Sequence, residues 1–238
     1  LLSSFENLIT DKTLSDEVVA GAIAVIAALE EGALPLDAAL TKLLEDRPDL
    51  EGSINYAFVM MGTSQGIEIL TASIQTNPSA NNIIELAKKG KKAHSATPIL
   101  LNLIEQGSSE ERFLATRALG FIGNIEAIPR LIEQLAVPFD VELNIAATQS
   151  LAMLGQETAI IPLNNVKNSH WYPPVRNAAA EAIQIIKGTL KPDESDDALR
   201  APYAFSYNKF MTEEICEAIT LTSRNESTES KLYKESHP

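Results

Sequence analysis

The residues with the most reactive side chains are few and widely spaced. They are His94, His170, His237 and Cys216. No two histidines have the one-turn spacing that places a pair of metal ligands on one helix face. The adjacent acids Glu110 and Glu111 point in different directions on a helix, which is typical of a solvated helix start. The sequence therefore predicts no catalytic residue, no metal site and no cofactor.

The run Lys88-Lys-Gly-Lys-Lys92, followed closely by His94, is the one dense cluster of cationic groups. It spans the end of an expected helix, where positive charge complements the helix dipole. The alternative interpretation is a site for an anion or for an acidic partner.

The elements that carry these residues repeat with a spacing of 32 between Arg112, Asn144 and Arg176. The columns that follow agree in size and polarity: Ala115, Ala147 and Ala179; Ala118, Ser150 and Ala182; Leu119, Leu151 and Ile183; Ile122, Leu154 and Ile186. A fixed period of roughly 20 to 50 residues indicates a solenoid, whose units must stack to bury their apolar faces.

Each repeat contains two runs with helical periodicity, separated by a glycine such as Gly123. Pro129 lies near the start of a second helix, where it is harmless in the first turn but would kink the helix one turn later. Earlier helix pairs are expected at 16–31 with 36–45, 54–61 with 67–75, and 81–89 with 97–106. The total is about five helix pairs, followed by a final helix over 175–187.

The run Arg112-Phe-Leu-Ala-Thr-Arg-Ala-Leu-Gly-Phe-Ile-Gly123, continued by Glu126-Ala-Ile-Pro-Arg-Leu-Ile-Glu133, resembles the short bacterial type of HEAT repeat. This resemblance implies an all-α fold, a right-handed α-α superhelix that binds other molecules. Asn144 stands where the pattern has arginine, which predicts an interruption of the stacked polar contacts. HEAT-like deoxyhypusine hydroxylases hold metal through His-Glu pairs, and this sequence has no such pair.

The chain of 238 residues has a net charge of −13. Residues 1–50 alone hold 10 acids and 3 bases. Nucleic-acid binding depends on cations that neutralise phosphates, so an acidic chain favours protein partners instead. The apolar run 18–29 is too short to span a membrane. The first residue, Leu1, predicts a processed or excised chain of undetermined compartment, and the single cysteine weakly favours the reducing cytoplasm.

The expected boundary of the solenoid lies at Gly188, with the clearest repeats over 108–188. Residues 189–238 are expected to form a polar linker, an aromatic segment, a short helix and a polar tail. The aromatic residues of that segment are Tyr203, Phe205, Tyr207 and Phe210. They are expected to fold back and cap the solenoid. The alternative is docking on a partner or on a second copy, which would produce self-association.

If the resemblance holds, the binding surface is the concave wall, lined by the second helix of each pair. Polar residues of these helices are expected to face solvent: Arg130, Glu133, Gln134, Asn164, Asn165 and Lys167. The only tryptophan, Trp171, lies in a tight connection before a repeat. It is expected to pack between repeats, with anchoring of a partner as the alternative.

These features favour a non-enzymatic adaptor or scaffold that binds a protein. The alternative is an enzyme or enzyme accessory of HEAT-like type, such as a bilin lyase. HEAT-like DNA glycosylases use a basic groove, which the acidic charge disfavours. A third interpretation is that the chain is one domain of a larger protein.

Overall fold

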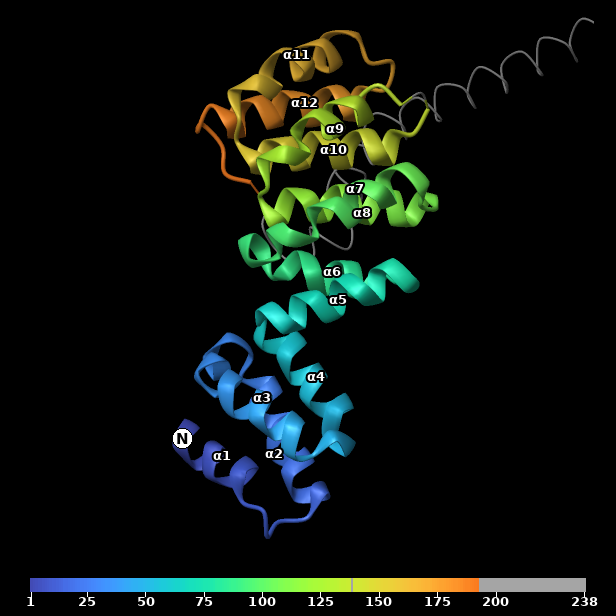
Figure 1. Ribbon diagram of the computed structural model, residues 1–238. Helices are drawn as coiled ribbons and strands as arrows, with labels where there is room; N and C mark the ends of the chain where they lie inside the picture. The colour runs from blue at the N-terminus through green and yellow to red at the C-terminus, as the bar shows by residue number, and fades with distance from the viewer. Residues whose placement is uncertain (138, 193–238) are drawn as a thin grey trace, which may run out of the picture.

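The computed structural model describes residues 1–137 and 139–192, and all regular structure in these ranges is helical (Figure 1). The α-helices are α1 (Leu2–Thr10), α2 (Asp16–Ala28), α3 (Asp37–Asp46), α4 (Glu51–Met61), α5 (Ser64–Thr76), α6 (Ala80–Lys88), α7 (Thr97–Gln106), α8 (Ser109–Ile122), α9 (Ile128–Gln134), α10 (Val141–Leu154), α11 (Ile160–Ser169) and α12 (Pro173–Ile186). Five short 3-10 helices lie between them in the described ranges. They are η1 (Glu30–Leu36) before α3, η2 (Pro48–Leu50) before α4, η3 (Gly90–Ala96) before α7, η4 (Ile125–Ala127) before α9 and η5 (Glu157–Ala159) before α11. The predicted all-α solenoid is confirmed, with pairs from α2/α3 to α10/α11 and α12 as the final helix.

Local signals set the ends of several helices. Ser108 and Glu111 form a reciprocal capping box at the start of α8. Gly123 ends α8 in the left-handed conformation, with a φ of 77°. Pro129 lies in the first turn of α9, so it starts the helix instead of kinking it.

The N-terminal end differs from the expectation in two ways. Helix α1 was not expected, although its Leu2, Phe5 and Ile9 pack on the N-terminal core. Helix α2 ends at Ala28, because Glu30 adopts a left-handed φ of 48° and turns the chain into η1. The apolar residues of α1 are spaced by three and four positions, which indicates a helix. The helix has only 9 residues, so this pattern is easily overlooked.

The buried side chains form two main cores. The N-terminal core extends from Ile9 to Met61, and the C-terminal core extends from Ile67 to Ile183. At the joint, α5 begins close against α4: a Cβ atom on Gly66 would lie 2.2 Å from the backbone oxygen of Phe58. In Figure 1, α5 lies between the N-terminal helices and the remaining stack. The solenoid therefore consists of two halves joined through α4 and α5.

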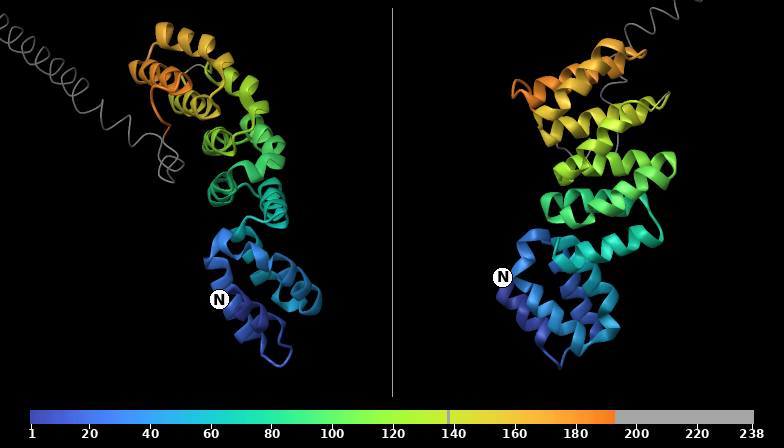
Figure 2. Two further views of the ribbon diagram at one scale, coloured as in Figure 1. Left: turned by 90° about the vertical axis from the view of Figure 1, so that its left-hand side faces the viewer. Right: turned by 45° about the horizontal axis from the view of Figure 1, so that its top comes forward.

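The helices form two rows, seen side by side in the left view of Figure 2. The first helices α6, α8, α10 and α12 pack closely on one another, whereas α7, α9 and α11 approach one another only marginally. Small residues allow the close row, since a Cβ on Gly120 of α8 would lie 2.8 Å from Ser150 of α10. The more closely spaced row lies on the inner side of a bend. The expectation that second helices line the concave wall is therefore wrong.

Candidate functional site

The candidate residues of α9 are largely engaged within the protein. Arg130 is half-buried and forms ion pairs with Glu105 of α7, at 2.9 Å, and with Glu133. Gln134 is only 5% exposed, and its side chain donates a hydrogen bond to the backbone oxygen of Arg130. The expectation that Gln134 faces solvent is wrong, because α10 packs against α9 and covers its last turn. Glu133 remains exposed.

The candidate residues of α11 are more accessible. Asn165 and Lys167 are exposed, and Asn164 is half-buried with its amide bonded to the backbone oxygen of Ile160 at 3.0 Å. Ile161 of the same helix is 74% exposed. Helix α11 therefore offers a mixed polar and apolar surface on the outer row.

A buried hydrogen-bond relay joins the last two repeats. Asn144, fully buried on α10, donates to the backbone oxygens of Gln134 and Val137 at 2.7 and 3.3 Å. Its side-chain oxygen lies 3.2 Å from Nε2 of His170. The Nδ1 atom of His170 accepts the backbone N–H of Tyr172 at 3.1 Å, so Nε2 is the donor to Asn144. The relay connects the end of α9 to the loop before α12.

Arg176 and Asn144 occupy equivalent repeat positions, and both side chains donate hydrogen bonds to backbone oxygens. Arg176 donates to the backbone oxygens of His170 and Trp171, at 2.7 and 3.1 Å. Each side chain thus satisfies backbone carbonyl groups that precede its own helix, those of Asn144 lying in the last residue of α9 and in the loop after it. The predicted interruption at Asn144 is wrong, because a shorter side chain makes the same class of contact from a fully buried position.

An exposed aromatic cluster lies where these loops meet. Trp171 is 59% exposed, and its ring centroid lies 6.2 Å from Phe139, 5.8 Å from His170 and 5.3 Å from Tyr172. Phe139 is 84% exposed and has a φ of 62°, which costs backbone energy for a bulky residue. The expectation that Trp171 packs between repeats is wrong. It lies at the loop edge, as the alternative required.

The basic cluster spans the joint between the two halves. Nζ of Lys89 donates to the backbone oxygen of Met60 in the last turn of α4 at 3.1 Å, and Lys92 pairs with Glu31 at 2.9 Å. His94 contacts the backbone oxygen of Ile122 at the end of α8, at 3.0 Å. Burial lowers the pKa of Lys89, while Glu85 opposes this effect. Lys89 and His94 thus reach backbone oxygens near the ends of the neighbouring helices α4 and α8, while Lys88 lies in the last turn of its own helix α6.

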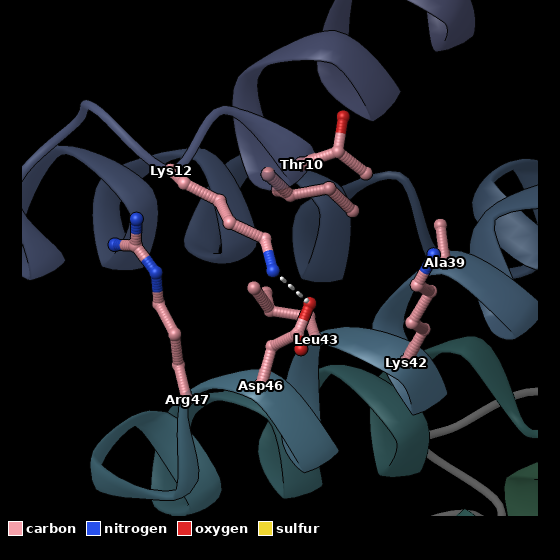
Figure 3. A pocket seen from close by; sticks show the side chains of 8 residues that line it. Thr10, Lys12, Ala39, Lys42, Leu43, Asp46 and Arg47 are labelled. Atoms are coloured by element: carbon pink, nitrogen blue, oxygen red, sulfur yellow. Dashed lines mark ion pairs between the residues drawn. The ribbon is translucent and has the colours of Figure 1, made fainter.

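A small cleft lies beside α1 and α3 (Figure 3). Its volume is about 170 Å³, and Lys12 pairs with Asp46 across it at 3.3 Å. Arg47 bonds to Asp16 at 2.9 Å and to the backbone oxygen of Asp11 at 3.1 Å. No sequence pattern indicated this cleft, since its residues come from separate helices. Its open, ion-paired lining provides no catalytic arrangement.

The described residues contain no cluster of three side chains able to hold a metal ion. Searching the same ranges, we find no helix with the length and apolar character needed to cross a membrane. Several residues singled out in the sequence lie outside the described residues: Tyr203, Phe205, Tyr207, Phe210, Cys216 and His237. The proposed cap or docking segment remains a prediction.

Comparison with known proteins agrees with the fold. Residues 97–184 match the family model for HEAT repeats. Over 84 residues the chain is 37% identical to the bilin biosynthesis protein PecE of Mastigocladus laminosus. That alignment covers 35% of this chain and 31% of PecE, so the similarity spans about a third of each protein. Residues 97–184 therefore match HEAT repeats, and the described residues form an all-α, HEAT-like solenoid.

Proposed function

We propose that this chain is a non-enzymatic scaffold that binds a protein partner through the exposed aromatic cluster of Phe139, Trp171 and Tyr172. The observation that carries the proposal is the exposure of two large aromatic side chains on loops held by a buried relay. Aromatic residues on a rigid support are the usual anchors of protein interfaces. Asn144, His170 and Arg176 supply that support through the loop carbonyl groups.

The exposed residues of α11 extend this surface. Asn165 and Lys167 lie on the helix that leads into the Trp171 loop, and they provide polar contacts around an apolar centre. Glu133 supplies a negative charge on α9. In this arrangement the partner meets the loop edge and the outer row, rather than the closely packed inner row.

The test is affinity enrichment from a lysate of the source organism, read by mass spectrometry, with the double variant Phe139→Ala and Trp171→Ala. The control is Leu8→Ala on α1, which also removes an exposed apolar side chain but lies in the N-terminal half. We expect a protein to be enriched by the wild type and the control but lost with the double variant. Thermal melting should show that all three chains are folded. Equal enrichment by all three would reject the aromatic cluster, and no enrichment would reject the scaffold.

A second candidate is an accessory role in bilin chemistry, favoured by the similarity to PecE. Titration with a free linear tetrapyrrole, followed by absorbance, tests this candidate directly. A shift of the bilin spectrum that the Trp171→Ala variant abolishes would support it. An unchanged spectrum would argue against direct bilin binding and leave protein binding as the function.

A further inference from the structure

Helix α2 is apolar on nearly every side. Val19, Ile23 and Ile26 face the N-terminal core. At 100° per residue, the opposite side carries the exposed residues Glu17, Val18, Gly21, Ala24, Val25 and Ala28. Val18 is 49% exposed and Val25 is 47% exposed. Glu17 is thus the only polar side chain on the exposed face of this helix.

The next first helix, α4, continues this surface. Its outward side carries Gly52 and Tyr56, with Val59 and Met60 half-buried beside them, and Tyr56 is 58% exposed. Because α2 and α4 pack side by side as consecutive first helices, their outward sides adjoin (Figure 1). We call the surface formed by Val18, Gly21, Val25, Tyr56 and Met60 the α2–α4 face.

This face is not what a helix in contact with water normally presents. An apolar character on all sides is typical of a buried helix. Gly21 weakens the middle of α2, and nothing lies within 4 Å of the position where its Cβ atom would be. No close neighbour within the described chain explains this glycine. A partner backbone that approaches Gly21 would explain it.

Charge identifies the kind of partner. Asp16 and Glu17 stand at the start of α2, and Glu30 and Glu31 follow its end. Asp16 pairs with Arg47 and Glu31 with Lys92, but both carboxylates keep side-chain exposures of 58% and 66%. A second copy of α2, packed antiparallel, would bring acidic ends against acidic ends. A helix with basic margins meets complementary charge instead.

We propose that the α2–α4 face binds an amphipathic helix of a partner protein, with an apolar stripe bordered by Lys and Arg. The stripe lies over Val18, Gly21 and Val25, which are spaced as one helical seam. The basic margins meet the acidic groups at the two ends of α2. This surface is separate from the aromatic cluster, so the inference does not depend on the proposed function.

The probe is a synthetic 18-residue helical peptide with a Leu and Ala stripe bordered by Lys, of about 27 Å when fully helical. A twin peptide has Glu in place of each Lys. Binding is measured by fluorescence anisotropy near physiological salt with the wild type, Val18→Ser with Val25→Ser, and Gly21→Leu. Ile161→Ser is the matched control, since it makes the same type of change on the C-terminal half without altering charge.

We expect the basic peptide to bind the wild type and the control equally, and to bind the double serine variant and Gly21→Leu at least tenfold more weakly. The Glu twin should not bind. Hydrogen exchange should show protection confined to α2 and α4. The Gly21→Leu variant should keep its melting temperature, because the space around position 21 is open and leucine favours a helix more than glycine does. A loss of peptide binding by this variant would therefore not reflect unfolding.

Three results would overturn the proposal. Equal affinity of all variants would show attraction by net charge alone. No binding of the basic peptide to the wild type would reject the basic helix as occupant. A wild-type dimer in light scattering that the Val18 and Val25 substitutions dissociate would assign the face to a second copy of this chain.

Discussion

The two halves of the solenoid use their first helices differently. In the C-terminal half, 10 of the 14 residues of α10 are buried, and polar groups such as Asn144 connect neighbouring repeats from inside. In the N-terminal half, 5 of the 13 residues of α2 are buried, although the helix is more apolar. Close stacking of small residues thus completes the C-terminal half, whereas the N-terminal half has an apolar face that no other described residue covers. The same repeat principle gives a closely packed stack in one half and an exposed apolar surface among the described residues of the other.

A substitution at the joint between the two halves should cause the largest loss of stability. We expect Gly66→Ala to destabilise the protein by about 3 kcal/mol, because the new Cβ would lie 2.2 Å from the backbone oxygen of Phe58. Urea unfolding should be followed by Trp171 fluorescence for the C-terminal half and by circular dichroism for the whole chain. The two probes should then give separate transitions. Coincident transitions and unchanged stability would show that α4 and α5 adjust easily. Gly52→Ala on α4 is the control, since nothing lies within 4 Å of it.

The buried relay is specific to the C-terminal half. We expect Asn144→Ala to cost about 2 kcal/mol, because the backbone oxygens of Gln134 and Val137 lose their donor in a buried site. Chemical unfolding measures this change. Asn165→Ala, an exposed asparagine on α11, should cost less than about 0.5 kcal/mol. If the two variants have the same stability, the relay does not stabilise the stack.

A glycine-to-alanine substitution should change the stability in opposite directions in the two halves. Gly120→Ala should destabilise by about 1.5 kcal/mol, because its Cβ would lie 2.8 Å from Ser150. Gly21→Ala should stabilise by about 1 kcal/mol, since the space is open and alanine favours the helix. Thermal melting of both variants tests the contrast. The same sign for both would mean that α2 is packed as closely as α8.

The ion pair across the joint should have the smallest effect. The hydrogen bond from Lys92 lowers the pKa of Glu31, and its positive charge adds to this effect. The pair therefore stabilises the fold above the ordinary pKa of glutamate, and this contribution is lost as the pH falls through the lowered value. Because both groups are exposed, we expect Glu31→Gln to cost no more than about 0.5 kcal/mol at neutral pH. The free energy of unfolding of the wild type and of Glu31→Gln should be measured at neutral and at acidic pH. If the difference between the two proteins grows toward acidic pH, the ion pair does not stabilise the fold.

Local patterns predicted the helices of the repeat region well. The apolar spacing, Gly123 and Pro129 act within a few residues of their own positions, so neighbouring sequence suffices to place α8 and α9. The prediction was weaker near the N-terminus. Helix α1 is short, and the left-handed φ of Glu30 ends α2 at Ala28, although the pattern predicted a helix to residue 31.

The candidate site could be predicted only in part. Trp171 was recognised as a packing residue or an anchor; the structure places it at an exposed loop edge, and anchoring of a partner stays a prediction. Phe139 was missed, because its neighbour in space is more than 30 residues away in the sequence. Gln134 was assigned to the wrong side, because a helical pattern alone does not say which neighbouring helix covers the last turn of α9.

The sequence by itself determined the repeat period, the helical class and the excess of acidic residues, since each follows from composition or short-range order. The tertiary structure decided which row of helices lies inside the bend, how Asn144 replaces an arginine, and which apolar faces no other described residue covers. These features depend on distances between residues one or more repeats apart. The close approach of Gly120 to Ser150, about one repeat away, is one such distance, and no periodic pattern records it.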